Sequence, residues 1–562
     1  MPLYETYTGR HRDEFATLDD LRANYTLTIP DDFNFAFDCL DRMAAETPEA
    51  LALLWLSNEG EEKRFTYEDI RRLSVKAAHF FAAQGIEKGD MVMLTMSRDW
   101  RFWPVLMGLH RMGAVAVPAT YLLTAKDIVY RMNAASVKML LTTPRFGVMQ
   151  AMEQALPECP TVEKLAVFGG NVPEGGLWID FDAALAKAPE TPVARNTVKS
   201  DPMLMSFSSG TTGYPKMVLH DYTYPLGHLA TGCFWHRCEE NGLHLTISDT
   251  GWLKSLWGKM YSQWLAGSAV LAYDFDKFSA PDILRKIEQY RVTTFCAPPT
   301  MYRYMIKEDL TQYDFSALKH CTTAGEALNP EVYKVWLKGT GLKIFEGFGQ
   351  TETTLSCWTG YPWMQPRLGS MGLPAPSYRL AICDENGAEV GPGVTGEICI
   401  RTDEAGGGKP FGLFMGYYRD EEMTRRIWHD DLYHTGDTAY TDEMGFLWYV
   451  GRVDDIIKSS GYRIGPFEVE SALMEHPAVT ECAVTGLPDA ERGFIVKATV
   501  VLSQGFAGSE ELTKQLQAHV KKVTAPYKYP RVIEYVDALP KTISGKIRRM
   551  EIRAKDTQNA GA

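Results

Sequence analysis

GDMVMLTM (Gly89–Met96), WPVLMGLHRMG (Trp103–Gly113) and AVAVP (Ala114–Pro118) follow one another and decide the fold class. The first and third stretches are short apolar runs, typical of strands that are buried on both faces. The middle stretch is long enough for a helix and has an amphipathic pattern. A strand, a helix and a strand in this order predict a βαβ unit in a parallel sheet.

The same alternation extends along most of the chain. Five further apolar runs predict buried strands, at Val137–Thr143, Lys164–Phe168, Ser268–Asp274, Thr293–Pro299 and Leu342–Gly349. We therefore expect two α/β subdomains, roughly residues 1–190 and 200–370. The stretch from about Ala186 to Pro202 is polar and rich in proline, which predicts a connection between them.

The pattern changes after residue 370. Two alternating runs surround an Asn-Gly turn within Arg379–Arg401, which predicts a β-hairpin inside a small β-rich subdomain, residues 371–450. Residues 453–562 mix helical and strand-like segments and predict a small, mobile α+β lid domain. The expected fold is thus α/β, with a large amino-terminal domain over residues 1–452 and this lid domain after it.

The composition is that of an ordinary globular protein. Of the 562 residues, 45% are hydrophobic and 23% charged, which excludes disordered, collagen-like and coiled-coil classes. The 58 Lys and Arg against 71 Asp and Glu give a net charge of −13, so we expect no nucleic-acid partner, because phosphate contacts need a basic surface. Ten scattered cysteines predict reduced, buried thiols.

No apolar run is long enough to predict a membrane span. The best candidate, residues 105–123, is interrupted by His110 and Arg111. The amino end has no apolar core and is rich in acidic residues, unlike a secretory signal or a transit peptide. We therefore expect a cytoplasmic protein without integral membrane association, and the sequence leaves its oligomeric state open.

A loop rich in hydroxyl groups and glycine, SFSSGTTGYPKMV (Ser206–Val218), has the chemistry of a phosphate cradle. Glycine lets the backbone approach an anion, the hydroxyls donate hydrogen bonds and Lys216 adds a positive charge. Its spacing is not that of a Walker A motif. A flexible surface loop is the alternative that this composition leaves open.

Two further segments carry groups suited to a nucleotide. EGFGQTETT (Glu346–Thr354) directly follows a predicted strand, where open α/β sheets bind ligands, and Glu352 could hold Mg²⁺. A helix cap is its alternative interpretation. YHTGDTAYTDEMGFLWYVGR places Asp437 in a tight turn and Arg452 after a strand. A carboxylate accepts from two ribose hydroxyls, and a guanidinium donates to phosphate or ribose oxygens.

In this order, the three motifs, GRVDDIIK (Gly451–Lys458) and PKTISGKIRR (Pro540–Arg549) closely resemble the adenylate-forming superfamily of acyl-CoA synthetases, adenylation domains and luciferases. The similarity extends from about residue 30 to 555. ISDTGW, FGQTE, SSGYRIGP and TAPYKYPR most resemble the medium-chain acyl-CoA synthetases. The resemblance implies that a carboxylate attacks the α-phosphate of ATP, releasing pyrophosphate, and that CoA then takes the acyl group and releases AMP.

The resemblance also implies roles for individual residues. For ATP it implies Ser208, Ser209, Gly210, Thr211, Thr212, Gly213, Gly325, Glu326, Glu346, Gly347, Phe348, Gly349, Gln350, Thr351, Asp437 and Arg452. The implied catalytic residues are Lys546, Thr351, Glu352 and Lys216, with Glu352 on Mg²⁺. Lys546 would meet the negative charge that develops on the α-phosphate. A solvated cation in a basic tail is its alternative.

The second step places different demands on the C-terminal domain. Members of the superfamily rotate this domain between the two steps, and Asp454 matches their hinge position. A helix-capping aspartate is the alternative. For CoA the resemblance implies Ser460, Gly461, Tyr462, Arg463, Arg492, Tyr527, Lys528 and Tyr529, with Arg463 as a possible contact to substrate or AMP instead. A basic surface patch is the alternative for this set.

One position bears on the size of the acid. Acetate-specific relatives carry Trp directly before Gln-Thr-Glu, whereas this chain has Gly349. Trp252 matches a pocket residue of the medium-chain family, and Trp257, Met260, Tyr261 and Trp264 recur at helical spacing as a second wall or as core. We expect a medium-chain or branched short-chain acid of about four to ten carbons, and a Gly349→Trp variant that prefers acetate.

Two cysteines and several histidines could suggest metal sites, and two other functions fit the motifs. CFWHRC (Cys233–Cys238) lacks the ligand spacing of a zinc site, and His429 and His434 have no third ligand in the sequence, so both are interpreted as structural. An adenylating enzyme with a carrier protein or oxygen as acceptor is the enzymatic alternative. An AMP- or acyl-adenylate-binding sensor is the non-catalytic one. Production of AMP and pyrophosphate with and without CoA separates the three.

Overall fold

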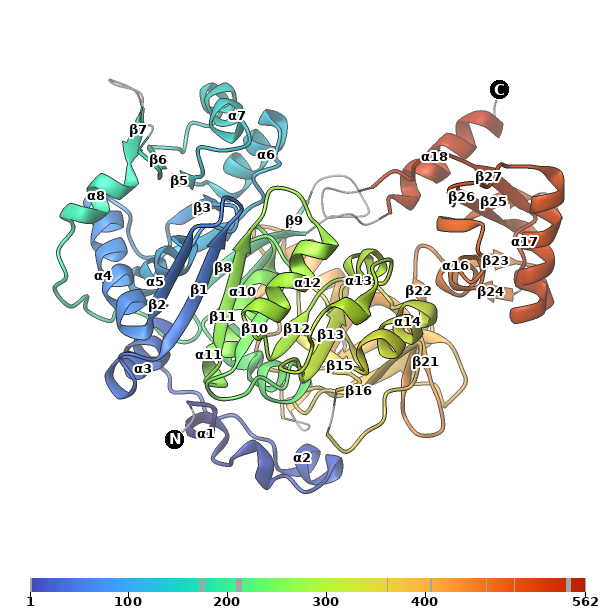
Figure 1. Ribbon diagram of the computed structural model, residues 1–562, viewed down its shortest axis with the longest axis horizontal. Helices are drawn as coiled ribbons and strands as arrows, with labels where there is room; N and C mark the ends of the chain where they lie inside the picture. Colours follow the sequence, from blue (N-terminus) through green and yellow to red (C-terminus); the bar gives the residue numbers. More distant parts are fainter. Residues whose placement is uncertain are drawn as a thin grey trace.

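The structure is a computed structural model that describes residues 3–170, 172, 177–208, 215–360, 362–404, 407–460, 462–489, 491–541 and 547–560. Figure 1 shows a large amino-terminal domain and, to one side of it, a small carboxyl-terminal domain in red. The predicted α/β class with a smaller last domain is confirmed.

The βαβ unit predicted from the first three stretches is confirmed at the centre of an eight-stranded sheet. β3 (Met91–Thr95) and β4 (Val115–Pro118) are parallel and fully buried, and α5 (Phe102–Met112) connects them. The helix ends at Gly113, whose φ of 74° suits glycine and stops a helix. The other strands of this sheet are β5 (Met139–Thr142), β6 (Lys164–Val167), β7 (Trp178–Asp180), β8 (Pro202–Ser208), β9 (Lys216–Asp221) and β19 (Gly416–Tyr417).

A second, larger sheet has a parallel half and an antiparallel half. Its parallel strands are β1 (Leu51–Ser57), β10 (Leu243–Thr246), β11 (Ala269–Asp274), β12 (Thr294–Cys296), β13 (His320–Ala324) and β14 (Ile344–Gly349). Antiparallel strands follow β14 in the hydrogen-bonded order β15-β16-β22-β21-β18-β17. The chain therefore places the ends of β13 and β14 next to the β-rich part.

Two strand pairs lie in the sheet of the other predicted subdomain. β1 and β2 (Glu62–Thr66) belong to the second sheet although they precede residue 190, and β8 and β9 complete the first sheet although they follow it. The subdomain ranges predicted from the sequence are thus not sheet boundaries. The pairing of β1 with β11 across more than two hundred residues depends on tertiary packing, which local patterns do not encode.

The β-rich part contains the predicted hairpin. β17 (Leu380–Cys383) and β18 (Gly396–Arg401) are antiparallel, with Leu380 opposite Ile400. Its other strands are β15 (Leu355–Trp358), β16 (Ser370–Pro374), β20 (Trp428–His429), β21 (Leu432–Thr441) and β22 (Leu447–Arg452). β18 pairs with β21, and β21 pairs with β22, so the motif around Asp437 lies on a central strand of this part.

The carboxyl-terminal domain has a core of its own, formed by residues between Ile457 and Val520. Its strands are β23 (Ile457–Ser459), β24 (Tyr462–Ile464), β25 (Val479–Asp489), β26 (Gly493–Leu502) and β27 (Val532–Tyr535), and its helices are α16 (Pro466–Met474), α17 (Glu510–Val523) and α18 (Arg549–Ala560). A separate core allows this domain to move as a unit, as the sequence predicts for a lid.

The remaining helices belong to the amino-terminal domain. They are α1 (Leu3–Thr8), α2 (Leu18–Asn24), α3 (Asp41–Glu46), α4 (Tyr67–Ala83), α6 (Ala125–Ala135), α7 (Val148–Ala155), α8 (Phe181–Lys187), α9 (Tyr224–Gly227), α10 (Leu253–Lys259), α11 (Tyr261–Leu265), α12 (Ala280–Gln289), α13 (Pro299–Met305), α14 (Pro330–Thr340) and α15 (Glu421–Ile427). Within the described ranges, no helix combines the length and apolar character needed to cross a bilayer.

Candidate active site

A cleft of about 1830 Å³ lies where the two domains meet. It is lined by residues from both large sheets, from the β-rich part and from the carboxyl-terminal domain. Among the predicted site residues, its lining includes Ser208, Lys216, Trp252, Trp257, Gly325, Glu326, Glu346 to Glu352, Asp437, Arg452 and Arg463. The structure therefore brings together residues that are more than two hundred positions apart in the sequence.

Asp437 forms the centre of a polar network in this cleft. Strand pairing puts Asp437 opposite Arg452, whose Nη1 lies 3.4 Å from Asp437 Oδ2. Tyr449 donates its hydroxyl to Asp437 Oδ1 at 3.3 Å, and Gln350 donates its amide to Asp437 Oδ2. Asp437 is 6% exposed. The carboxylate is thus fixed in orientation, and it links the FGQTE turn to β21.

Glu352 and Lys216 meet through a residue that the sequence analysis missed. Tyr417 donates its hydroxyl to Glu352 Oε1 at 2.8 Å and accepts from Lys216 Nζ at 3.3 Å. Burial lowers the pKa of Lys216, and the nearby Glu352 carboxylate opposes this shift. Tyr417 reaches the site because β19 pairs with β9, with Tyr417 opposite Val218. No local motif around Tyr417 predicts that pairing.

A second missed residue, His220, holds the FGQTE turn from the first sheet. Its Nε2 lies 2.8 Å from the carbonyl oxygen of Thr351. Burial lowers the pKa of His220 to about 3, so the ring is neutral at pH 7 and donates to that carbonyl. β9 therefore supports both sides of the site, with Lys216 at its start and His220 near its end.

Glu346 and Glu326 have partners within the protein. Glu346 accepts the amide of Leu328 at 3.0 Å, and burial raises the pKa of its carboxyl to about 8. Glu326 accepts from the hydroxyl of Thr300 at 3.1 Å. Gly325 has a φ of 108°, which a side chain rarely tolerates, and a Cβ there would meet open space. Glu346 thus holds the 325–328 segment against β14.

Only part of the predicted aromatic wall faces the cleft. Trp257 lines it beside Trp252, whereas Tyr261 and Trp264 are fully buried in the core. The helix is interrupted at Met260, whose φ of −158° and ψ of −79° separate α10 from α11. The regular helical spacing of the sequence therefore does not continue, and Met260, Tyr261 and Trp264 are core residues.

The structure places Gly349 in the lining of the cleft and close to another backbone segment. A Cβ at this position would lie 2.5 Å from the carbonyl oxygen of Thr354, next to a bulge between Phe348 and Gly349. A side chain here therefore requires the Thr354 backbone to shift, and the expectation that Gly349→Trp moves the preference toward acetate stays a prediction.

We expect Gly349→Ala to lower acid-dependent ATP–pyrophosphate exchange by about tenfold or more with every acid tested, because a misplaced catalytic turn loses activity steeply. The ratio of rates between short and long acids should stay unchanged. Gly391→Ala is the matched control, because a Cβ there meets open space outside the cleft. A changed chain-length ratio in Gly349→Ala with normal rates would contradict this expectation and support the pocket interpretation.

Most of the residues predicted for CoA contact other residues of the protein. Tyr462 and Tyr527 stack with ring centroids 4.1 Å apart, and the Ser460 amide donates to the Arg492 carbonyl at 3.0 Å. Tyr529 instead lies under the Lys521 ammonium group. Arg463 forms an ion pair with Glu385 of the β-rich part, and Lys528 forms one with Glu468. Tyr462 and Tyr527 are exposed, whereas Arg463 lines the cleft.

Asp454 lies in the turn between the two domains. The Asp455 amide donates to the Arg452 carbonyl at 3.0 Å, which closes this turn, and the Asp454 carboxylate lies 3.7 Å from Arg452 Nε. Its hinge role stays a prediction. Ser209, Gly210, Thr211, Thr212, Gly213, Gly461 and Lys546, all predicted site residues, lie outside the described residues.

Most side chains of the CFWHRC segment pack in the interior. Cys233 and Cys238 are buried free thiols, and His236 Nδ1 lies 3.1 Å from the hydroxyl of Thr322. Among the described residues, these three side chains are not part of any group with metal-ligand spacing.

Family models and known relatives match this chain along most of its length. The model described as "AMP-binding enzyme" matches residues 40–418, and "AMP-binding enzyme C-terminal domain" matches residues 468–546. The mitochondrial acyl-coenzyme A synthetase ACSM3 of Mus musculus is 38% identical, covering 99% of this chain and 96% of the relative. The mitochondrial acyl-coenzyme A synthetase ACSM4 of Homo sapiens is 40% identical, covering 94% and 91%.

Solved structures match equally widely. The anthranilate CoA ligase AuaEII, in complex with anthranoyl-AMP, is 28% identical with a TM-score of 0.86, covering 95% of this chain and 99% of that one. The acyl-CoA synthetase of Brucella canis is 32% identical with a TM-score of 0.73, covering 97% and 99%.

Proposed function

Because this chain belongs to the family of AMP-binding enzymes, we propose that it is an AMP-forming acid–thiol ligase that converts a carboxylic acid to its acyl-CoA. In the first step the acid's carboxylate attacks the α-phosphate of ATP, forming an acyl-adenylate and expelling pyrophosphate. In the second the CoA thiol attacks the acyl carbonyl and AMP leaves. The observation that carries this proposal is the joint position of Asp437, Gln350, Glu352 and Lys216 in one cleft.

Each of these residues has a place in the first step. Asp437, held by Tyr449, Gln350 and Arg452, is suited to accept hydrogen bonds from the ribose hydroxyls. Lys216 is suited to the β- and γ-phosphates, because it lies at the end of the Ser206–Val218 loop. Protein groups in phosphoryl transfer mainly position the substrate and stabilise charge, which is the role proposed for these residues.

The donor set at Glu352 fits Mg²⁺. Its carboxylate is 9% exposed, lines the cleft and has one oxygen fixed by Tyr417. A hard divalent cation prefers one or two carboxylates together with phosphate oxygens. Bound there, Mg²⁺ would neutralise charge on the departing pyrophosphate. The chain's own contribution is to hold Glu352 in place through Tyr417 and to add the positive charge of Lys216.

The proposed substrate is a medium-chain or branched short-chain acid. Trp252 and Trp257 line the cleft close to the FGQTE turn, and Trp257 stacks on His228 at 5.4 Å between ring centroids. A rigid aromatic wall favours apolar chains and limits their length. A panel of acids from two to sixteen carbons, scored by AMP and pyrophosphate release with and without CoA, tests this function. AMP release that does not depend on CoA would contradict it.

We expect Trp257→Leu to shift selectivity toward longer acids, raising the ratio of kcat/KM for eight-carbon over six-carbon acids by about tenfold, because the two additional buried methylenes contribute about 1.6 kcal/mol. Trp264→Leu is the matched control, since that indole donates to the Ala52 carbonyl in the core at 3.1 Å and does not line the cleft. The control should unfold at a lower temperature with unchanged selectivity. An equal shift in both variants would contradict the assignment of Trp257.

The location of the chain is part of the proposal. We propose the cytoplasm, a reducing compartment that suits ten free, buried cysteines. The mouse and human relatives are named as mitochondrial proteins. Fractionation of the source cells, with the tagged full chain followed by immunoblotting, decides between the two compartments.

A further inference from the structure

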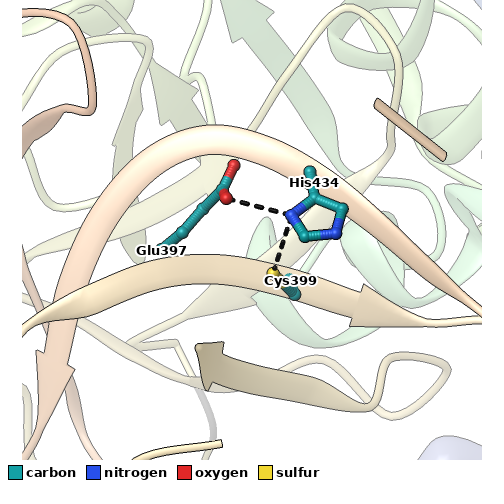
Figure 2. Close-up of side chains that lie close together, drawn as sticks. All are labelled: Glu397, Cys399 and His434. Atoms are coloured by element: carbon teal, nitrogen blue, oxygen red, sulfur yellow. Dashed lines mark hydrogen bonds and ion pairs between the residues drawn. The ribbon is translucent and has the colours of Figure 1, made fainter. Parts of the chain in front are cut away.

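Three side chains of the types that bind metals meet on the β-rich part (Figure 2). They are Glu397 and Cys399 of β18 and His434 of β21. The sequence analysis found no third ligand for His434, and the structure corrects this. Strand pairing places Cys399 directly opposite His434, and a bulge between Glu397 and Cys399 turns both side chains toward the imidazole.

The spacing of the three side chains suits one small cation. Glu397 Oε2 lies 3.0 Å and Cys399 Sγ lies 3.6 Å from His434 Nδ1. All three ligand atoms lie within 4.8 Å of one another. A tetrahedral zinc site, with Zn–S of about 2.3 Å and Zn–N or Zn–O of about 2.0 Å, requires ligand atoms about 3.3–3.6 Å apart. The cluster is therefore close to binding geometry without any movement of the backbone.

Burial and access also favour an ion at this point. Cys399 is fully buried, whereas the side chains of His434 and Glu397 are 16% and 23% exposed and line the cleft. A cation can thus approach from the cleft side and keep one position for water, as in zinc sites with three protein ligands. His429, stacked on His434 at 4.4 Å, is 47% exposed and turns its ring face to the cluster.

We propose that Glu397, Cys399 and His434 bind a thiophilic divalent cation, for which Zn²⁺ is the best match. On binding, the Cys399 thiol releases its proton to solvent and its sulfur bonds to the metal. His434 loses the Nδ1 proton that it donates to Glu397, gains one on Nε2 and binds the metal through Nδ1, so that the Glu397–His434 hydrogen bond is replaced by two metal–ligand bonds. Thiolate and imidazole select Zn²⁺ over Mg²⁺, so this site differs in chemistry from Glu352.

The proposed site is connected to the nucleotide site through Glu397. Its second oxygen, Oε1, accepts the Gly436 amide at 2.8 Å, and Gly436 directly precedes Asp437. A cation on Oε2 therefore binds the same carboxylate that holds the Gly436 amide. We expect Zn²⁺ to change the affinity for AMP by a few fold. Metal binding itself is measured directly, so its test does not depend on any enzymatic activity.

The test uses Co²⁺ as a spectroscopic substitute for Zn²⁺ on the full chain. Wild-type protein should bind one Co²⁺ with a thiolate-to-cobalt absorption band, and Zn²⁺ should displace it. Cys399→Ser should abolish the band, and His434→Gln and Glu397→Gln should each weaken binding by about 100-fold or more, since even outer-shell changes weaken metal sites by 10–100-fold. Thermal unfolding of each variant checks that it folds. If the buried Cys399→Ser variant does not fold, the partly exposed Glu397→Gln variant provides the test.

Two neighbouring residues serve as matched controls. Cys383 lies on the adjacent strand β17, and His429 stacks on His434, but neither belongs to the three-ligand group. Cys383→Ser and His429→Gln should keep the band and the affinity. The proposal is overturned if wild-type protein binds no stoichiometric Co²⁺, if Cys399→Ser keeps the band, or if a control loses it to the same extent.

Discussion

Lys546→Ala is expected to lower acid-dependent ATP–pyrophosphate exchange by about 10²–10³-fold while leaving the dissociation constant of ATP within a few fold of its original value. A cation that meets charge only as the α-phosphate is attacked stabilises the transition state and not the bound substrate. Loss of one such group typically costs this much. The effect should therefore appear in kcat and hardly in KM for ATP.

The described neighbours of Lys546 support this expectation. Lys541 and Ile547 form a β-bridge on either side of the segment that contains it, and Ile547 lines the cleft. Lys541 itself is held by Glu481 at 2.7 Å. The chain on both sides of Lys546 is thus fixed to the carboxyl-terminal domain next to the cleft.

Lys555→Ala is the matched control, because this lysine of the same basic tail is 61% exposed and pairs only with Glu534 among the described residues. It should retain full exchange activity. ATP affinity is measured by calorimetry without the acid, and exchange with labelled pyrophosphate. Undiminished exchange in Lys546→Ala would remove this residue from the mechanism.

Asp437→Ala should give the opposite kinetic pattern, with ATP and AMP affinity reduced by about 10²–10³-fold. Two hydrogen bonds from ribose hydroxyls to an ionised acceptor contribute about 1.5–3 kcal/mol each. The substitution also removes the acceptor of the Tyr449 hydroxyl and one of the acceptors of Gln350 and Arg452, which keep the Thr435 carbonyl. We therefore expect a lower unfolding temperature as well, which saturating nucleotide restores only in part.

Asp437→Asn is the control that separates charge from shape. It keeps one acceptor oxygen and the size of the side chain, so its loss of affinity should be smaller, about tenfold, with little change in stability. Calorimetric titration with AMP and a thermal unfolding scan measure the two effects. If Asp437→Ala unfolds at a lower temperature but binds AMP normally, Asp437 is a structural residue and the ribose assignment is wrong.

Local sequence patterns predict some features of this protein and not others. The strands β3, β4 and β14 could be predicted because each is an apolar run whose period and flanking residues fix its conformation. The motif around Asp437 could be located from its local composition, but the predicted tight turn is wrong: Asp437 lies within β21, and Gly436, with a φ of 70°, lies beside a bulge in the β18–β21 pairing. The partners of Asp437 could not be located, because Gln350 and Tyr449 reach it through strand pairing.

The dependence on strand pairing also explains which site residues the sequence did not predict. Tyr417 and His220 were missed because their functions arise only when β19 and β9 pair and the two sheets meet. The close approach of the Thr354 backbone to Gly349 could not be predicted either, because it depends on tertiary structure. The aromatic residues after Trp257 follow a helical period that the break at Met260 interrupts.

By itself, then, the sequence determined the α/β class, the order of the elements and the chemical character of each motif, because these depend on hydrophobic period and on side-chain chemistry. Only the tertiary structure decided which strand joins which sheet, that Tyr417 couples Lys216 to Glu352, and that Cys399 faces His434. Strand register and sheet contacts join residues far apart in the chain. Their free energy depends on the whole packed core, which no local pattern contains.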